Sequence, residues 1–256
     1  DDPTLAQPLR RGGSSFGGAM TLRINCCSGP RNLSTALMYS FRQRSDTTVF
    51  DEPFYAHYLK VTGRQHPGRD EVLASQSTDP GQVTEEIMLG DHGTPVVFFK
   101  QMAHHLIEMD RSFLTQCANV LLVRDPTEML ASYSVKMTDA TLADTGLEAQ
   151  VMLLEEILAN GETPIVLDAT TLRRNPRQAL EAFCSQLGLP FDEAMLAWPA
   201  GPKPEDGVWE KHWYAGVHAS NGFLPYQPST ATVAKHLQPV IDQAQPLYQR
   251  LCAYAS

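Results

Sequence analysis

The chain has 256 residues, of which 43% are hydrophobic and 19% are charged, and this is enough for one large α/β domain with a buried core. Its net charge of −9 argues against general nucleic-acid binding, and no apolar run reaches the roughly 18–20 residues that would span a bilayer. The five cysteines, an odd number with no C-x-x-C pair, are expected to be free thiols in a reducing cytoplasm.

Residues 1–19 show no apolar periodicity and lack the hydrophobic segment of a signal peptide. We therefore interpret them as an expression-vector leader. The patterned sequence begins at Met20, and we expect a single domain over residues 20–256.

Beyond this leader, continuous apolar runs alternate with stretches of helical spacing. Strands are predicted at residues 22–27, 47–51, 95–100, 119–124 and 164–168. Helices or helical turns are predicted at residues 34–41, 54–60, 81–89, 106–117, 127–136, 147–160, 176–187 and 233–253, whereas 63–79 is typical of a loop with some helix and 201–226 has no clear period. This alternation predicts an α/β fold in which helices flank a parallel β-sheet on both faces.

Charged side chains follow or close the predicted strands, where parallel sheets bind their ligands. They are Arg31, Glu52, Lys100, Arg124 and Asp168. Because the carboxyl ends of parallel strands meet at one edge of a sheet, we expect a shared crevice to collect these side chains.

The segment between the first strand and the first helix has the composition of an anion site. It reads Ser28-Gly29-Pro30-Arg31-Asn32-Leu33-Ser34-Thr35. Backbone N–H groups of such a loop, the positive end of the following helix and the guanidinium of Arg31 can converge on one phosphate-like group. The loop is not a Walker A motif, since the lysine and the second glycine are missing, and this disfavours magnesium-dependent NTP hydrolysis. The alternative is an ordinary strand-to-helix turn with a serine cap and a surface arginine.

A second pair of residues is spaced to hold another phosphate. Arg124 ends the strand at 119–124, and Ser132 lies about two helical turns later. A guanidinium and a hydroxyl can bind a phosphate together. In the alternative, Arg124 pairs with Asp125 or Glu128 and Ser132 lies on a helix surface.

In this order, the motifs resemble those of the sulfotransferases that use 3′-phosphoadenosine 5′-phosphosulfate (PAPS), and the bacterial and tyrosyl-protein branches more than the cytosolic branch. In that family a P-[KR]-S-G-T-T or P-R-S-G-[ST]-T loop wraps the 5′-phosphosulfate. A strand-end arginine and a serine, at the spacing of Arg124 and Ser132, hold the 3′-phosphate. Residues 168–196 are similar to a late family segment that contains L-G-L-P-F. The resemblance covers residues 21–197 and implies a P-loop NTPase-like sulfotransferase fold.

Two features depart from the family pattern. Leu33 stands where the family has glycine, which restricts the backbone and its approach to a phosphate. The R-K-G loop of the cytosolic branch is missing, and residues 211–222 stand in its place. We expect this segment to fold over the nucleotide, with Lys211 near an anion and a tryptophan stacked on the base, and the alternative is a hydrophobic flap.

The resemblance offers two residues for the catalytic base. Glu52 matches the catalytic glutamate of the bacterial and tyrosyl-protein branches, and the alternative is a structural carboxylate paired near Arg31. The cytosolic branch uses a histidine in K-x-H, and here Lys100 is followed by His104 and His105, two residues too far along the chain. Histidine suits base chemistry through its ordinary pKa, so His104 is the second candidate.

The resemblance implies an in-line transfer of a sulfuryl group from PAPS to a small-molecule alcohol, which leaves 3′-phosphoadenosine 5′-phosphate (PAP) and requires no metal. Its predicted catalytic residues are Glu52, Arg31, Lys100 and His104, and its predicted donor-binding residues are Ser28, Gly29, Pro30, Arg31, Asn32, Leu33, Ser34, Thr35, Arg124, Ser132 and Lys211. Neither nucleic acid nor membrane is an expected partner, and a homodimer is left open. The competing hypotheses are a kinase-like P-loop phosphotransferase and a catalytically silent nucleotide-binding protein of the same fold.

Overall fold

The computed structural model describes residues 21–227 and 233–255, so the predicted leader at 1–19 lies outside the described residues. A five-stranded parallel sheet forms the centre, in the order β2-β3-β1-β4-β5. Its strands are β1 (Leu22–Ser28), β2 (Thr47–Asp51), β3 (Val96–Met102), β4 (Ala118–Val123) and β5 (Ile165–Asp168). All five strands lie where the apolar runs predict them, and the predicted α/β fold is confirmed.

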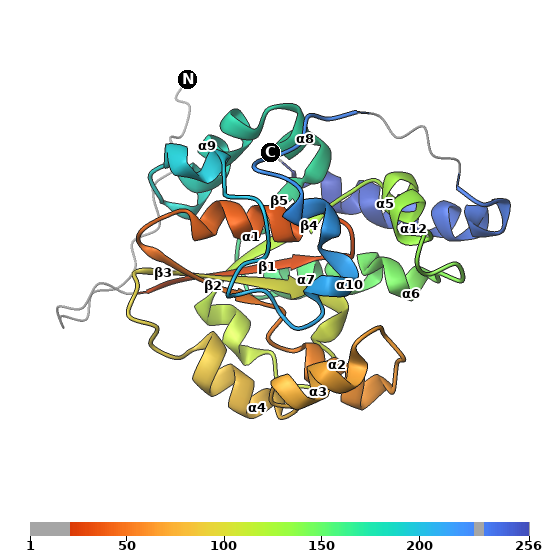
Figure 1. Cartoon of the computed structure of the whole chain (residues 1–256), viewed down its shortest axis with the longest axis horizontal. Coiled ribbons are helices and arrows are strands. Elements are labelled where there is room, and N and C mark those ends of the chain that lie inside the picture. The colour runs from red at the N-terminus through yellow and green to blue at the C-terminus, as the bar shows by residue number, and fades with distance from the viewer. Residues whose placement is uncertain (1–20, 228–232, 256) are drawn as a thin grey trace, which may run out of the picture.

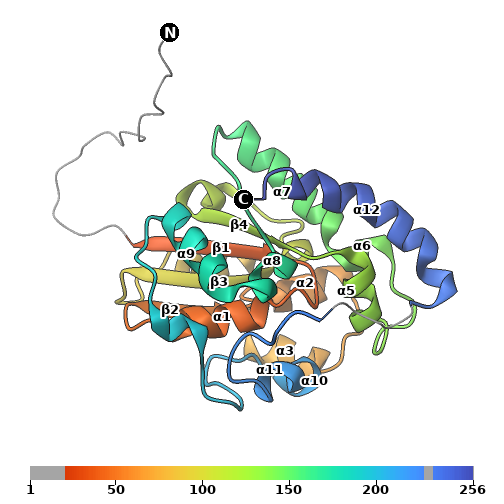
Figure 2. The same cartoon turned by 90° about the horizontal axis from the view of Figure 1, so that it is seen from above.

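Helices cover both faces of the sheet (Figure 1, Figure 2). One face is covered by α1 (Ser34–Arg42), α8 (Ala169–Arg174) and α9 (Pro176–Leu187), and the other by α7 (Leu147–Ala159) and α12 (Gln238–Cys252). Neighbouring side chains of β3 point to opposite faces of the sheet. Phe98 therefore packs in the core under α1, α8 and α9, whereas Val97 and Phe99 pack in the core under α7 and α12. Strands that are buried on both faces require apolar side chains throughout, which explains the continuous runs in the sequence.

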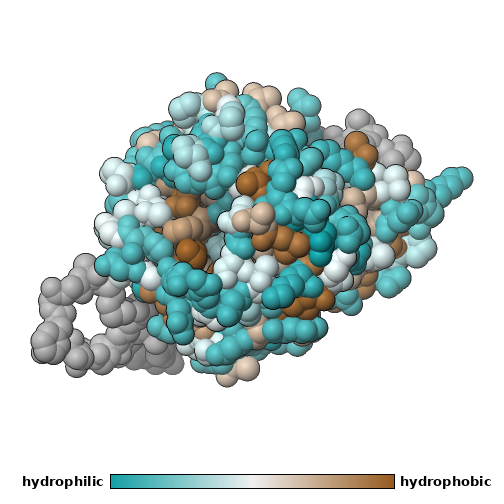
Figure 3. Space-filling model, turned by 60° about the horizontal axis from the view of Figure 1, so that its bottom comes forward, coloured by the Kyte–Doolittle hydropathy of each residue, from teal (hydrophilic) through white to brown (hydrophobic). Residues whose placement is uncertain are grey.

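Shorter helices connect these layers. They are α2 (Tyr55–Thr62), α3 (Arg69–Ser75), α4 (Pro80–Val83), α5 (Pro126–Tyr133), α6 (Leu142–Thr145), α10 (Glu210–Trp213) and α11 (Ala215–His218). A π-helical turn spans Thr84–Met88, and 3₁₀ turns span Ala103–His105, Ser112–Gln116, Glu193–Leu196 and Lys235–Leu237. Hydrophilic side chains cover most of the face in Figure 3, with small hydrophobic groups between them. No helix of the described ranges is long and apolar enough to cross a membrane.

Three predicted segments differ from the structure. The predicted helix at 106–117 is wrong, because Glu108 adopts a left-handed φ of 47° and only the 3₁₀ turn Ser112–Gln116 forms. The predicted helix at 81–89 begins at Pro80 under an Asp79 cap and widens into the π-helical turn. Residues 201–226 contain α10 and α11, which are too short to produce a period.

The five cysteines, all within the described ranges, are free thiols. Cys26, Cys27 and Cys184 are buried, and the other two are partly exposed. Burial raises the pKa of Cys26 to about 12. This thiol is therefore a packing residue of β1 and not a nucleophile.

Helix α5 carries Glu128 and Ser132 and begins at an aspartate cap. Asp125 Oδ1 accepts hydrogen bonds from the Thr127 and Glu128 N–H groups at 2.9 and 3.2 Å. We expect Asp125→Ala to lower the free energy of unfolding by about 1 kcal/mol, because two N–H groups of the first turn lose their acceptor. Urea denaturation measures this, with the exposed Asp139→Ala as the matched control. Equal unfolding midpoints for the two variants would contradict the role of the cap.

Candidate active site

One cavity of about 340 Å³ lies beyond the carboxyl ends of the strands. It collects most of the residues predicted from the motifs: Pro30, Arg31, Asn32, Leu33, Ser34, Thr35, Glu52, Lys100, His104, Arg124 and Ser132. Three predicted residues do not line it: Ser28, Gly29 and Lys211. The shared crevice thus forms from segments that are far apart in the chain.

The two small residues at the end of β1 support the loop from behind. Ser28 is fully buried, and its Oγ lies 3.4 Å from the Gln101 carbonyl. A Cβ atom on Gly29 would lie 2.2 Å from the Thr145 carbonyl oxygen, so only glycine fits at this position. Asp168, which the sequence placed at the crevice, instead caps α8 and accepts a hydrogen bond from Tyr248 at 2.8 Å.

The loop between β1 and α1 turns through two left-handed residues. Arg31 has a φ of 61° and Leu33 a φ of 66°, in the region that favours glycine. Leu33 adopts this conformation although it carries a side chain, and that side chain packs against the core beneath α1. Leu33 is also the N-cap residue of α1, and its apolar side chain cannot accept a hydrogen bond. The N–H groups of the first turn, which lie at the cavity, therefore have no capping side chain as an acceptor.

Two arginines meet at the end of the cavity next to α5. Arg31 donates from Nε to Ser132 Oγ at 3.1 Å and from Nη1 to the Trp213 carbonyl at 3.1 Å. Arg124 donates to the Arg31 carbonyl at 2.7 Å and to Glu128 Oε2 at 3.3 Å. Burial and the nearby Arg124 charge lower the pKa of Arg31. This end of the cavity therefore concentrates positive charge, and Arg124 pairs with Glu128 as one of the alternatives expected.

A buried group of charges lies at the ends of β2 and β3. Lys100 Nζ donates to Asp51 Oδ1 at 2.8 Å and to Glu52 Oε1. The side chains of Lys100, Asp51 and Glu52 are 2%, 1% and 8% exposed. Glu52 thus pairs with Lys100, whereas the alternative from the sequence was a pairing near Arg31.

Glu52 itself has an unusual backbone. Its φ of 44° is left-handed, and its N–H donates to the Lys100 carbonyl at 2.8 Å. Its own carbonyl accepts hydrogen bonds from the Tyr55 N–H and from Gln76 Nε2, both at 3.1 Å. Such a conformation costs of the order of 1–3 kcal/mol and persists only where surrounding contacts hold it, often at functional sites.

The charges in this group shift each other's pKa. Burial raises the pKa of Glu52 to about 7, the Asp51 carboxylate adds to this rise, and the Lys100 ammonium opposes it. Burial alone would lower the pKa of Lys100, but Asp51 and Glu52 raise it above its ordinary value. Lys100 is therefore charged at neutral pH, and Glu52 titrates close to neutrality.

Two histidines follow β3, and one of them, His105, faces Glu52. The His105 ring lies between Tyr55 and Tyr58, with ring centroids 4.7 and 4.5 Å away, and its Nδ1 is 3.8 Å from Glu52 Oε2. Burial lowers the pKa of His104 to about 4 and that of His105 well below 6.5. Both imidazoles are therefore neutral near pH 7.

The segment that replaces the R-K-G loop lies beside the cavity. Trp213 lines it and lies parallel to Tyr133, with ring centroids 6.3 Å apart. Lys211 instead pairs with Glu71 on the surface at 2.6 Å. Trp209 and Tyr214 pack in an apolar cluster with residues of α2 and α3, as a hydrophobic flap would.

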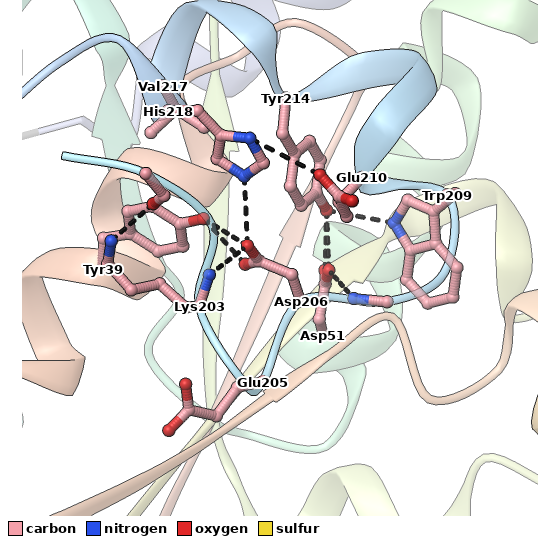
Figure 4. A network of polar contacts seen from close by, with 12 residues as sticks. Tyr39, Asp51, Lys203, Glu205, Asp206, Trp209, Glu210, Tyr214, Val217 and His218 are labelled. Carbon is pink, nitrogen blue, oxygen red and sulfur yellow. Dashed lines mark hydrogen bonds and ion pairs between the residues drawn. The ribbon is translucent and has the colours of Figure 1, made fainter.

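Asp51 and Tyr214 are functional candidates that the motifs did not single out. Tyr214 Oη is 2.7 Å from Lys100 Nζ and 2.7 Å from Asp51 Oδ2. Figure 4 shows the contact between Tyr214 and Asp51 beside further polar contacts of Asp206 with Tyr39 and His218. The only signal in the sequence was that Asp51 precedes Glu52 at a strand end. Residues 21–227 and 233–255 hold no group of three or more His, Cys, Asp or Glu that could bind a metal ion.

Comparisons with known proteins show the family to which the chain belongs. Two Arabidopsis thaliana proteins, branched-chain-amino-acid aminotransferase-like proteins 1 and 2, are 36% and 35% identical to the chain over 229 residues. The match covers 89% of this chain but only 41% of each relative. A crystal structure of a sulfotransferase from Alicyclobacillus acidocaldarius has a similar fold, with a TM-score of 0.50 and 15% identity over 91% of this chain and 96% of that one. Residues 22–255 match the model of the sulfotransferase domain, and the chain therefore belongs to the sulfotransferase family.

Proposed function

We propose that this domain transfers a sulfuryl group from PAPS to a hydroxyl group of a small molecule. One observation carries the proposal: a single cavity joins a cluster of anion-binding groups to a buried carboxylate of raised pKa. The sheet order supports it, because the arginine end lies above β1 and β4 and the Glu52 end lies above β2 and β3. A donor bound along the cavity would bring its sulfur toward Glu52.

In this proposal the donor lies between the two phosphate sites. Arg124 and Ser132 hold the 3′-phosphate, and a bidentate guanidinium fits this group. The loop N–H groups and the hydroxyls of Ser34 and Thr35 hold the 5′-phosphate at the N-terminus of α1. Arg31 then neutralises the charge that builds on the oxygen between phosphorus and sulfur.

The reaction is an in-line displacement at sulfur. The acceptor O–H bond breaks and its proton goes to Glu52, while the acceptor oxygen forms a new S–O bond. The bond between sulfur and the 5′-phosphate oxygen breaks, and its electron pair leaves with PAP. A sulfate ester carries less charge than a phosphate ester, so positioning and fixed positive charge from Arg31 and Lys100 are the contributions required of the protein.

The pKa values favour Glu52 over His104 as the base. A general base works best when its pKa is near the working pH. Glu52 has a pKa of about 7, whereas His104 has a pKa of about 4 and accepts a proton poorly at neutral pH. Aromatic and imidazole rings, among them Tyr55, His66 and Trp209, line the cavity near Glu52 and suit a neutral hydroxyl compound.

Nucleotide binding distinguishes this proposal from a kinase-like enzyme. We expect PAP to raise the melting temperature without magnesium, since ligand at 100 times its Kd adds about 2.7 kcal/mol of stability. ATP with magnesium should give a smaller shift, because it lacks the 3′-phosphate that Arg124 and Ser132 would hold. A thermal-shift series with PAP, PAPS and ATP measures this, and a larger shift with magnesium and ATP would contradict the proposal.

Transfer of the labelled sulfuryl group from PAPS to 2-naphthol, a neutral hydroxyl probe, then separates an enzyme from a catalytically silent nucleotide-binding protein.

Removal of the Arg124 guanidinium should weaken nucleotide binding. A hydrogen bond to a charged group contributes about 1.5–3 kcal/mol, so we expect Arg124→Ala to bind PAP roughly 10- to 100-fold more weakly. Isothermal titration calorimetry measures the affinity. Arg250→Ala, which removes a surface ion pair with Glu155, is the control. Unchanged PAP affinity in Arg124→Ala would overturn the assignment of the 3′-phosphate site.

The pH dependence of turnover should report Glu52. The base must be ionised, and its folded-state pKa of about 7 lies above the ordinary value of 4.5, so kcat/KM should rise as the pH increases through about 7. Glu52→Gln should lower kcat by about 10²–10⁴-fold and leave PAP affinity unchanged. In His104→Ala, kcat/KM should still rise as the pH increases through about 7. Normal turnover in Glu52→Gln together with an inactive His104→Ala would identify the histidine as the base.

A further inference from the structure

Lys100 has no spare N–H group, because its three donors already meet three acceptors. Its Nζ lies 2.8 Å from Asp51 Oδ1 and 2.7 Å from Tyr214 Oη, and it also donates to Glu52 Oε1. An ammonium has three donors and no more. The proposed reaction needs an N–H group of Lys100 at the sulfuryl oxygens. All three N–H groups are therefore occupied until one of the three partners releases its hydrogen bond.

Two of the three partners are themselves held in place. Tyr214 Oη accepts a hydrogen bond from Trp209 Nε1 at 3.0 Å and donates its own proton to Asp51 (Figure 4). Asp51 Oδ2 also accepts from the Gly207 N–H at 3.1 Å. These contacts join the end of β2 to the segment that carries α10, so neither partner can leave Lys100 without breaking them.

Glu52 differs from these partners because its charge changes during the proposed reaction. While Glu52 is ionised, two carboxylates face one ammonium. Once Glu52 takes up a proton, Asp51 alone balances Lys100, and the contact from Lys100 to Glu52 becomes a bond to a neutral carboxylic acid. The Coulomb attraction between the ammonium and the Glu52 carboxylate is lost when that carboxylate becomes neutral, so this is the contact that weakens.

We propose that Asp51 and Tyr214 are positioning residues that retain two N–H groups of Lys100, so that the third passes from Glu52 to a sulfuryl oxygen as Glu52 takes the acceptor proton. This inference rests on the proposed sulfuryl transfer. The proton goes to Glu52 Oε2, the oxygen that Lys100 does not contact, and Lys100 keeps its three protons throughout. The bonds at sulfur form and break as described above.

The first test needs neither nucleotide nor acceptor. The Glu52 carboxyl carbon is titrated by NMR in the full chain, in Asp51→Asn and in the control Asp206→Asn. Asp206 lies in the same segment, just before α10, and contacts Tyr39 and His218, but it does not contact Lys100 or Glu52. We expect the Glu52 midpoint to fall by about one pH unit in Asp51→Asn, because a like charge is removed, and to stay in place in Asp206→Asn. An unmoved midpoint in Asp51→Asn, or equal shifts in the two variants, would overturn the role of Asp51.

The second test follows the Lys100 ammonium itself. The exchange of its protons with water is measured by ¹⁵N NMR in Tyr214→Phe and in Tyr39→Phe, which loses a hydroxyl from the same network without touching Lys100. We expect exchange about tenfold faster in Tyr214→Phe, since one hydrogen bond to a charged group is lost. Equal exchange rates in the two variants would overturn the role of Tyr214.

Turnover connects the two tests to the reaction. With PAPS and 2-naphthol, Tyr214→Phe should lower kcat with little change in the KM for PAPS or in PAP affinity, whereas Tyr39→Phe should match the wild type. A raised KM without a loss of kcat would contradict the proposal. If PAP binds to no variant and not to the wild type, the proposed function fails, and the NMR measurements still decide whether Asp51 and Tyr214 hold Lys100.

Discussion

The buried ammonium of Lys100 constrains three parts of the molecule at once. Its partners come from the end of β2 and from the segment that carries α10, and Asp51 lies directly opposite Lys100 in the register of β2 and β3. Removing one partner of a buried ion pair costs about 3–5 kcal/mol, because it leaves a charge without compensation. Burial at this place raises the pKa of Glu52 toward neutrality, the Asp51 carboxylate adds to the rise and the Lys100 ammonium opposes it, so Asp51 both fastens the segment beside the cavity and favours the proposed base.

The order of the strands explains how one cavity can serve a donor and an acceptor. The phosphate loop follows β1 and the Arg124 motif follows β4, and these strands are neighbours in the sheet. Glu52 and Lys100 lie at the ends of β2 and β3, on the other side of β1. A nucleotide held by the arginines would therefore extend toward the carboxylate, and a hydroxyl compound would enter among the aromatic rings beside it.

The sequence predicted the elements and residues whose spacing is local. Arg31 and Ser34 belong to one loop, and Arg124 and Ser132 to one strand–helix unit, so their meeting in the cavity followed from the parallel sheet. The contact of Tyr214 with Asp51 joins residues 163 positions apart, and no spacing rule could indicate it. Lys211 was expected near an anion but pairs with Glu71, because the fold of that segment depends on apolar packing against α2 and α3 and not on a motif. The helix predicted at 106–117 does not form because Glu108 adopts a left-handed backbone conformation, and the amino-acid composition of the segment does not indicate this conformation.

A crystal structure of the domain with PAP would show directly whether one cavity aligns the donor with Glu52. We expect the 3′-phosphate within hydrogen-bonding distance of Arg124 and Ser132. The 5′-phosphate should lie at the N–H groups of the first turn of α1, with its open side toward Glu52. A nucleotide bound outside this cavity, or bound in the reverse direction with its 3′-phosphate next to Glu52, would rule out this alignment.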